Sequence, residues 1–149
     1  MQIDDELARR LVAGVDKINE QHKEIFDFTN DLFCHCVGDD DAENKFFGET
    51  VISLVDLVVA HFKTEEDLML ETKLDVYEFV EHKKEHDEFV MTIEEYAIRF
   101  HATKGIDLLA FTGYAKWWII GHIKRFDKKY VDYFNKITAG KGIKRMVVR

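Results

Sequence analysis

The chain has 149 residues, enough for one domain whose core folds without disulfides or a structural metal. Its net charge of -8 disfavours a nucleic acid or an anionic membrane as a partner. The sequence contains no proline and only eight glycines, a composition that favours long uninterrupted helices. We therefore predict a single all-α domain over residues 1–149.

The N-terminal residues and the cysteines indicate a cellular compartment. The segment from Met1 to Glu6 is acidic and lacks the apolar run of a secretory signal, and no apolar stretch reaches the length of a membrane span. Cys34 and Cys36 are too few and too close for a disulfide framework, as is usual in a reducing compartment. We expect a cytoplasmic protein without membrane contact, and we interpret both cysteines as helix-end residues.

Four segments repeat apolar residues at helical spacing, which predicts four helices. In chain order they cover residues 18–37, 42–71, 76–102 and 106–137. Gly38 and the acids after it end the first helix, and Thr103–Gly105 ends the third. Short loops make successive helices antiparallel, so the sequence predicts an up-down-up-down four-helix bundle.

The two ends of the chain lie outside this pattern. Residues 1–17 are expected to form an N-terminal arm, and residues 138–149 a short C-terminal tail that is solvated and frayed. The tail is basic and has no acid, with Lys141, Lys144, Arg145 and Arg149. Once the inner faces of the four helices are used, no large apolar stripe remains, so we expect a monomer.

Polar side chains interrupt the apolar stripes at one level of the predicted bundle. At a rise of about 1.5 Å per residue, five of them lie near the same end: His22, His61, Glu65, His82 and His86. The pairs 61/65 and 82/86 are four residues apart, so each pair projects from one helix face. His122 and Asp127 join this level only if the fourth helix extends beyond the others. Their five-residue spacing is not a same-face spacing, so Asp127 must reach in from the flank.

A metal centre would explain why so many ionisable groups occupy core positions. Burying them unpaired would cost several kcal/mol each, comparable with a total domain stability of about 5–15 kcal/mol. Imidazole and carboxylate ligands without thiolate suit iron, manganese, copper or zinc. Seven ligands exceed what one ion uses, which implies two ions with about one coordination position left open. His35 and His101 fall outside this level and are expected at the surface.

These residues resemble the hemerythrin family over most of the chain, from Gly14 to about Tyr133. The likeness rests on one motif in each helix: Gly14–Phe26 around His22, His61–Glu66 followed by Met69, His82–His86, and Trp118–Ile123 followed by Asp127 and Tyr130. The length is similar to that of the bacterial single-domain members. The missing tryptophan before the first helix, and a loop at residues 72–76 without glycine or proline, depart from the family pattern away from these motifs.

The resemblance implies a centre of two non-haem iron ions, bridged by carboxylates and by an oxo or hydroxo group. The implied ligand sets are His82, His86 and His122 for one iron, His22 and His61 for the other, and Glu65 and Asp127 as the bridges. The five-residue spacing of the last two ligands is the family's own. The iron with two histidines would keep the open position, beneath an oxygen pocket formed by Ile119 and Trp118.

The function that the resemblance implies is reversible binding of dioxygen, for transport, storage or delivery. Delivery would need a recipient, for which an oxygen-consuming enzyme is the expected partner. Two alternatives stay open: a sensor of oxygen or redox state, and an oxidase or peroxidase at the same centre. A histidine-rich set favours binding over turnover, because ferritin-like oxidases use anionic carboxylate ligands. The sequence shows no fused signalling segment, which favours the carrier. We therefore expect a protein that is not an enzyme.

Overall fold

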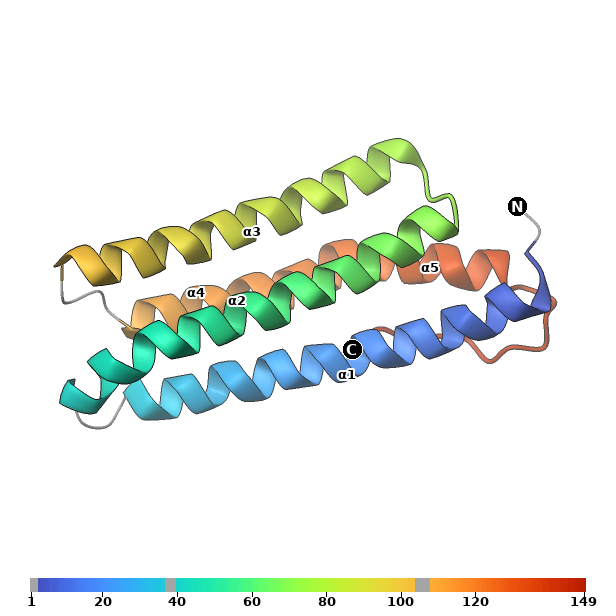
Figure 1. Ribbon diagram of the computed structural model, residues 1–149. Coiled ribbons are helices and arrows are strands. Elements are labelled where there is room, and N and C mark those ends of the chain that lie inside the picture. Colours follow the sequence, from blue (N-terminus) through green and yellow to red (C-terminus); the bar gives the residue numbers. More distant parts are fainter. Residues whose placement is uncertain (1–2, 37–39, 104–107) are drawn as a thin grey trace.

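The computed structural model, which describes residues 3–36, 40–103 and 108–149, is an antiparallel four-helix bundle (Figure 1). This confirms the predicted fold class. The bundle consists of α1 (Asp5–Cys36), α2 (Asp40–Glu71), α3 (Val76–Thr103) and a fourth rod made of α4 (Leu108–His122), η1 (Ile123–Asp127) and α5 (Lys128–Ile137). The side chains of His35 and His101 lie outside the described ones, so their surface positions stay predictions.

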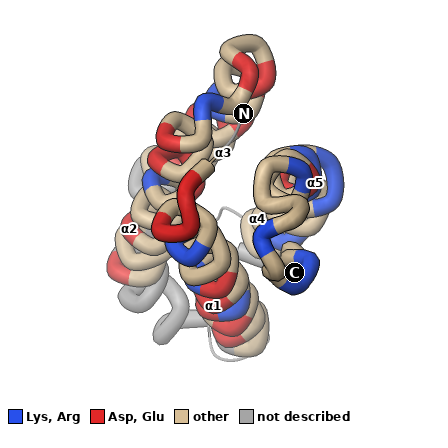
Figure 2. Tube along the Cα trace, turned by 90° about the vertical axis from the view of Figure 1, so that its right-hand side faces the viewer, with Lys and Arg blue, Asp and Glu red and all other residues tan. Residues whose placement is uncertain are grey.

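The helices form a square in cross-section. α1 packs against α2 and α4, and α3 packs against the same two helices. In Figure 2, which looks along the bundle, α1 and α3 accordingly lie at opposite corners. Side chains from all four rods therefore converge on one central axis, where the polar level predicted from the sequence is placed.

Side-chain and main-chain caps define the helix ends near the α2–α3 loop. The Oδ1 atom of Asp75 accepts hydrogen bonds from the amides of Tyr77 and Glu78, at 2.9 and 3.3 Å, and so caps the start of α3. α2 ends where Lys73 adopts the left-handed conformation, with φ of 55°. The amides of Lys73 and Leu74 then return to the carbonyls of Leu70 and Met69. A lysine thus takes the position that glycine usually occupies.

The predicted N-terminal arm is wrong, because α1 begins at Asp5 and continues without a break to Cys36. Asp4 caps this helix, accepting a 2.7 Å hydrogen bond from the amide of Leu7. Leu7, Leu11 and Ile18 are buried, and they extend the apolar stripe of α1 toward its N-terminus at helical spacing. Residues 5–17 are therefore part of the bundle core.

The prediction of a frayed C-terminal tail is also wrong, although most of its residues are exposed as expected. Gly140 and Gly142, with φ of 83° and 71°, reverse the chain after α5, and the tail returns along α1. Met146 is only 7 % exposed, and both its amide and its carbonyl are hydrogen-bonded to the side chain of Asn135, at 2.8 and 2.9 Å. The basic residues of the tail are exposed, as is Val147, while Met146 is buried and Val148 packs against the bundle.

The fourth rod was expected to be a single α-helix over residues 106–137, and it is interrupted by one π-helical turn, η1. The amide of Lys128 bonds to the carbonyl of Ile123, five residues earlier, where an α-helix would use the fourth. One extra residue is thereby inserted into the helix. The turn lies between His122 and the buried carboxylate of Asp127, at the level of the polar groups.

Two apolar clusters fill the bundle on either side of that level. One lies toward the α3–α4 connection and includes Leu54, Phe89 and Phe111. The other lies toward the α2–α3 loop and includes Leu11, Met69 and Phe134. In the described part of the chain, no helix combines the length and the apolarity needed to cross a membrane.

Candidate metal centre

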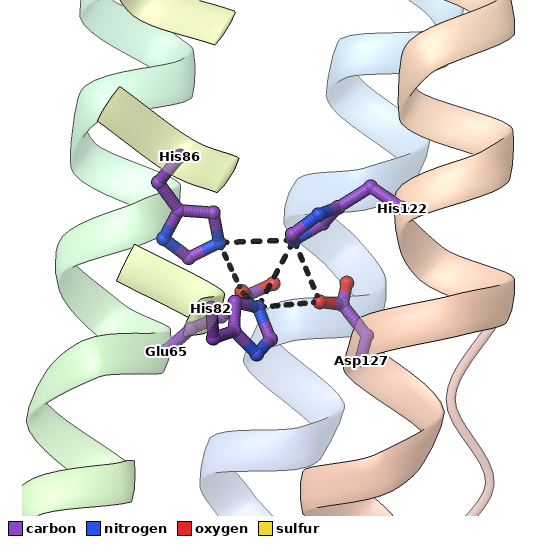
Figure 3. A group of neighbouring side chains, drawn as sticks. All are labelled: Glu65, His82, His86, His122 and Asp127. Carbon is purple, nitrogen blue, oxygen red and sulfur yellow. Dashed lines mark hydrogen bonds and ion pairs between the residues drawn. The ribbon is translucent and has the colours of Figure 1, made fainter. Parts of the chain in front are cut away.

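Seven ionisable side chains gather between the two apolar clusters, and none of them is more than 3 % exposed. They are the seven residues singled out from the sequence, and every rod contributes at least one: His22, His61, Glu65, His82, His86, His122 and Asp127. The structure therefore brings the whole predicted set together. Figure 3 shows five of them, which come from α2, α3 and the fourth rod.

The π turn brings Asp127 into this group. His122 and Asp127 are five residues apart, which would place them on different faces of a regular α-helix. The inserted residue rotates Asp127 back toward the bundle axis, so that its Oδ1 lies 3.1 Å from Nε2 of His122. A sequence spacing that is unfavourable in an α-helix is thus a same-face spacing here.

Each oxygen of Glu65 faces a different group of histidines. Oε2 lies 3.1 Å from Nε2 of His86 and 3.3 Å from Nε2 of His82. Oε1 lies 2.6 Å from Nε2 of His61, one turn away on α2, and 3.5 Å from Nε2 of His22. The carboxylate therefore spans the space between a three-histidine side and a two-histidine side.

Asp127 spans the same space from the opposite wall. Its Oδ1 lies 3.1 Å from Nε2 of both His82 and His122, and its Oδ2 lies 3.1 Å from Nε2 of His22. The donor atoms form two overlapping sets, each with its members within 4.8 Å of one another: Glu65, His82, His86, His122 and Asp127 in one, and His22, His61, Glu65 and Asp127 in the other. The two carboxylates belong to both sets.

The spacing of these atoms fits metal ligands. Ligands at about 2.1 Å from an ion, at right angles to one another, are about 3 Å apart. Most of the nitrogen–oxygen distances between neighbouring donors in the centre are close to this value (Figure 3). Each set could therefore hold one ion, and Glu65 and Asp127 would contribute to both.

Hydrogen bonds on the outer nitrogens fix which atom of three histidines faces inward. Nδ1 of His61 donates to Oε1 of Gln21 at 2.9 Å, and Nδ1 of His86 donates to Oε2 of Glu66 at 2.8 Å. Nδ1 of His22 donates to the main-chain oxygen of Arg149 at 2.5 Å. Because each acceptor is an oxygen without a hydrogen, Nδ1 carries a hydrogen, and Nε2 is the atom that faces the centre.

The inward-facing atoms lack enough hydrogens to pair with one another. Nε2 of His122 lies 3.0 Å from Nε2 of both His82 and His86, and a single N–H cannot serve both contacts. Among the described residues, Nε2 of His22 and all four oxygens of Glu65 and Asp127 are buried without a hydrogen bond of good geometry. Such groups are costly unless a cation lies between them. The donor set therefore fits bound metal.

The pKa values show that the centre attracts positive charge. Burial lowers the pKa of His22 and His82, but contacts with Asp127 and Glu65 outweigh this effect and raise both pKa values to about 9. Burial alone would raise the pKa of each carboxyl, yet the surrounding histidines hold the pKa of Glu65 and of Asp127 below its ordinary range. Both acids are therefore ionised, and their charge is available to protons or to metal ions.

A family comparison agrees with this geometry. Residues 13–134 match the family model described as the hemerythrin HHE cation-binding domain. The chain belongs to the hemerythrin family. The family expectation from the sequence is thereby confirmed, and the matched residues include all seven members of the centre.

Individual relatives cover most of the chain. It is 32 % identical to a bacteriohemerythrin of Stenotrophomonas maltophilia over 82 % of this chain and 76 % of the relative. It is 34 % identical to a bacteriohemerythrin of Methylococcus capsulatus over 75 % of this chain and 82 % of that one. A hemerythrin-like protein of Naegleria gruberi is 33 % identical over 79 % of this chain and 83 % of its own length. No solved structure matches the chain.

A small apolar cavity adjoins the centre in this hemerythrin-family bundle. It has a volume of about 10 Å³, close to the space that one water-sized molecule requires. Ile119 and Trp118 line it, as do Phe62 and Phe89 from α2 and α3. Its wall also includes both histidines of the two-histidine side, His22 and His61, together with His122 of the other side.

Aromatic rings hold the histidines of the other side. The ring of His122 stacks on Trp118, with centroids 4.4 Å apart, and Phe126 stacks on its opposite face. The ring of His86 stacks on Phe62 at 3.7 Å. These contacts restrict rotation of the imidazoles and surround them with apolar atoms.

Sequence reasoning missed the partners of the outer nitrogens. Gln21 and Glu66 each adjoin a residue of the centre, and a polar residue next to a buried one on a helix could have suggested this role. Arg149 carried no such signal, because 127 positions separate it from His22 and it belongs to a segment expected to be solvated.

Proposed function

We propose that the protein binds two non-haem iron ions and uses them to bind dioxygen reversibly. In this proposal His82, His86 and His122 hold one ion, and His22 and His61 hold the other. Glu65 and Asp127 bridge the two ions. The observation that carries the proposal is the pair of overlapping donor sets that share both carboxylates, buried without enough hydrogens to satisfy one another.

The choice of iron rests on the family and on the ligands. Imidazole with carboxylate suits iron, and the family model is that of a cation-binding domain. When bound, a pair of ferrous ions supplies the electrons that a dioxygen molecule takes up and returns on release. The protein supplies five neutral imidazoles and two carboxylates, and the carboxylates offset two of the four positive charges of a ferrous pair within a buried site.

The two-histidine side is the proposed place for dioxygen. Three histidines and two carboxylates come close to saturating one ion, whereas two histidines and the same carboxylates leave the other with a free position. The cavity lined by Ile119 and Trp118 touches both histidines of that side, and only His122 of the other. Its apolar wall excludes water and protons, which would otherwise promote loss of electrons from the centre.

A binding function is favoured over an oxidase or peroxidase by the space at the centre. A cavity of about 10 Å³ is close to the size of one water-sized molecule and leaves no room for an organic substrate beside the centre. Histidine ligands also favour the lower oxidation state compared with the glutamate-rich centres of ferritin-like oxidases. Transport, storage or delivery to an oxygen-consuming enzyme would all use this property.

Anaerobic reconstitution tests the proposal. The purified chain is loaded with ferrous iron, desalted and analysed for metal, and its absorption spectrum is then recorded before air, after air and after vacuum. We expect two iron ions per chain, a new visible band in air and its disappearance under vacuum. An intact bundle that retains no iron would contradict the metal centre. Iron uptake followed by an irreversible spectral change would contradict reversible binding.

A further inference from the structure

The C-terminal segment contacts a proposed iron ligand. Figure 1 shows the C-terminus beside the middle of α1, far from the end of α5 where the tail begins. At this point the main-chain oxygen of Arg149 accepts the 2.5 Å hydrogen bond from Nδ1 of His22. The C-terminal segment supplies no proposed ligand of its own, but it accepts the hydrogen on Nδ1 of His22, which is one.

Asn19 holds this segment in place from the same helix. Its Nδ2 donates to the carbonyl of Val147 at 2.9 Å, and its Oδ1 accepts from the amide of Arg149 at 2.7 Å. Asn19 is three residues before His22, so the two side chains lie on the same face of α1. Together they make three hydrogen bonds to residues 147–149, and these bonds fix both the position and the direction of the C-terminal segment.

The segment is also anchored to α5. Asn135 of α5 bonds to both main-chain groups of Met146, whose side chain is buried among Leu11, Val131 and their neighbours. Val148 packs against both apolar clusters, above and below the polar level. Residues 146–149 therefore connect α5 to α1 directly across the face of the centre that carries His22.

We propose that residues 146–149, held by Asn19 and Asn135, are a positioning element for His22. The main-chain oxygen of Arg149 holds the ring by its Nδ1–H, so that Nε2 faces Glu65 and Asp127. An acceptor on the outer nitrogen also makes an imidazole a better metal ligand. This inference rests on the proposed metal function, and it concerns only the two-histidine side.

The other outer partners have a different origin, which makes the inference specific. Gln21 and Glu66 are side chains on α1 and α2, and they are fixed as soon as the bundle forms. The partner of His22 is in place only when the tail is docked. Weakening the tail should therefore loosen His22 and leave His61 and His86 as they are.

The test uses Asn19→Ala and Asn135→Ala in the full chain, loaded with zinc as a diamagnetic probe. Each variant removes hydrogen bonds to the segment, one from α1 and the other from α5. We expect the Nδ1–H resonance of His22 to broaden through exchange with water in both variants, while those of His61 and His86 stay sharp. One of the two zinc ions should be lost to a chelator about 10–100-fold more readily than in the unmodified chain.

Lys141→Ala is the matched control. Lys141 belongs to the same tail and pairs with Asp5 at 3.2 Å on the surface, away from the centre. This variant should keep the His22 resonance and both zinc ions, and circular dichroism should show that all three variants are folded.

An unchanged His22 resonance with unchanged zinc release in both asparagine variants would overturn the inference. Equal loss of both ions would overturn it as well, because that result indicates a general loosening of the bundle. If the unmodified chain binds no pair of ions, the proposed function fails instead. The Nδ1–H resonance of His22 in the metal-free chain then still decides whether the tail holds this ring.

Discussion

Nε2 of His122 and Oδ1 of Asp127 are 3.1 Å apart although the two residues are five positions apart in a helical rod. The π turn between them makes this contact, and it gives Asp127 access to histidines from three different helices. The contact therefore depends on a backbone feature of five residues as much as on the identities of the two side chains.

Asp127→Asn is expected to weaken the binding of both metal ions, because the aspartate is shared by the two donor sets. An amide offers one oxygen in place of two and carries no charge. The loss should exceed the 10–100-fold typical of a residue that only supports a ligand. Metal analysis after dialysis measures it. Asp132→Asn changes an exposed aspartate of α5 in the same way and should leave two ions bound.

Stability of the metal-free protein should fall as the pH rises from about 6.5 to 9. The folded pKa values of His22 and His82 are raised to about 9, so the stabilising contribution of each is complete below the unfolded value and is lost as the pH passes through the folded one. The expected loss is on the order of 3 kcal/mol for each histidine. Urea unfolding of the metal-free chain at several pH values measures it.

Metal affinity should change in the opposite direction over the same pH range. A metal ion needs the unprotonated imidazole, so raising the pH removes the competing protons from His22 and His82. Competition with a chelator at pH 7 and pH 9 gives the comparison. A metal-free protein that becomes more stable between these values would show that the imidazoles are not protonated in the folded state.

Ile119→Glu should abolish oxygen binding and leave both ions in place. Ile119 is 5 % exposed and lines the cavity on the two-histidine side, so a carboxylate there would fill the space and occupy the free position. Ile120→Glu is the control, because this neighbour is 42 % exposed. Spectra in air should distinguish the two variants. Normal oxygenation of Ile119→Glu would show that dioxygen binds elsewhere.

Gln21→Ala should lower metal affinity about 10–100-fold, through His61. The substitution leaves Nδ1 of His61 without its acceptor, and it also removes the 3.2 Å hydrogen bond from Gln21 to Thr64 that orients the amide. Glu20→Ala removes an exposed neighbour of the same helix and should have no such effect. Chelator competition compares the metal affinities of the two variants. Equal affinities would show that Gln21 does not support the centre.

Lys73→Gly should stabilise the protein by about 1 kcal/mol, since it removes a side chain from the left-handed conformation. The gain is reduced by the greater freedom of glycine in the unfolded chain. Lys84→Gly, at an exposed position inside α3, should instead cost about 1 kcal/mol. Urea unfolding gives both values. A destabilised Lys73→Gly would indicate that the lysine side chain contributes contacts of its own.

The sequence was sufficient to predict the bundle and to assemble the seven residues of the centre. His61 and Glu65, like His82 and His86, follow a spacing that only an α-helix brings to one face, and apolar residues around them mark the inner side. His122 and Asp127 broke this rule, and only the likeness to a family justified including the aspartate. A π turn has no spacing signature that a single sequence reveals, because it is an insertion into a regular helix.

The two ends of the chain were predicted less well. Leu7, Leu11 and Val15 continue the stripe of α1 at helical spacing, so the sequence carried a signal for the start of α1 that the predicted arm left out. The tail was judged by its basic residues, which do face outward, whereas its docking depends on Met146, Val148 and main-chain groups. Hydrogen bonds from main-chain atoms to distant side chains do not depend on which residue supplies them, so no sequence pattern marks them.

All the residues around the cavity beside His22 and His61 are buried. The diatomic guest that we propose would therefore enter and leave when side chains such as Ile119 or Trp118 change rotamer, on the time scale of motions within a packed interior. The rate of exchange would then be a property of how tightly these side chains pack, while the strength of binding would be a property of the ligands beneath them. Evolution could adjust either one without altering the other.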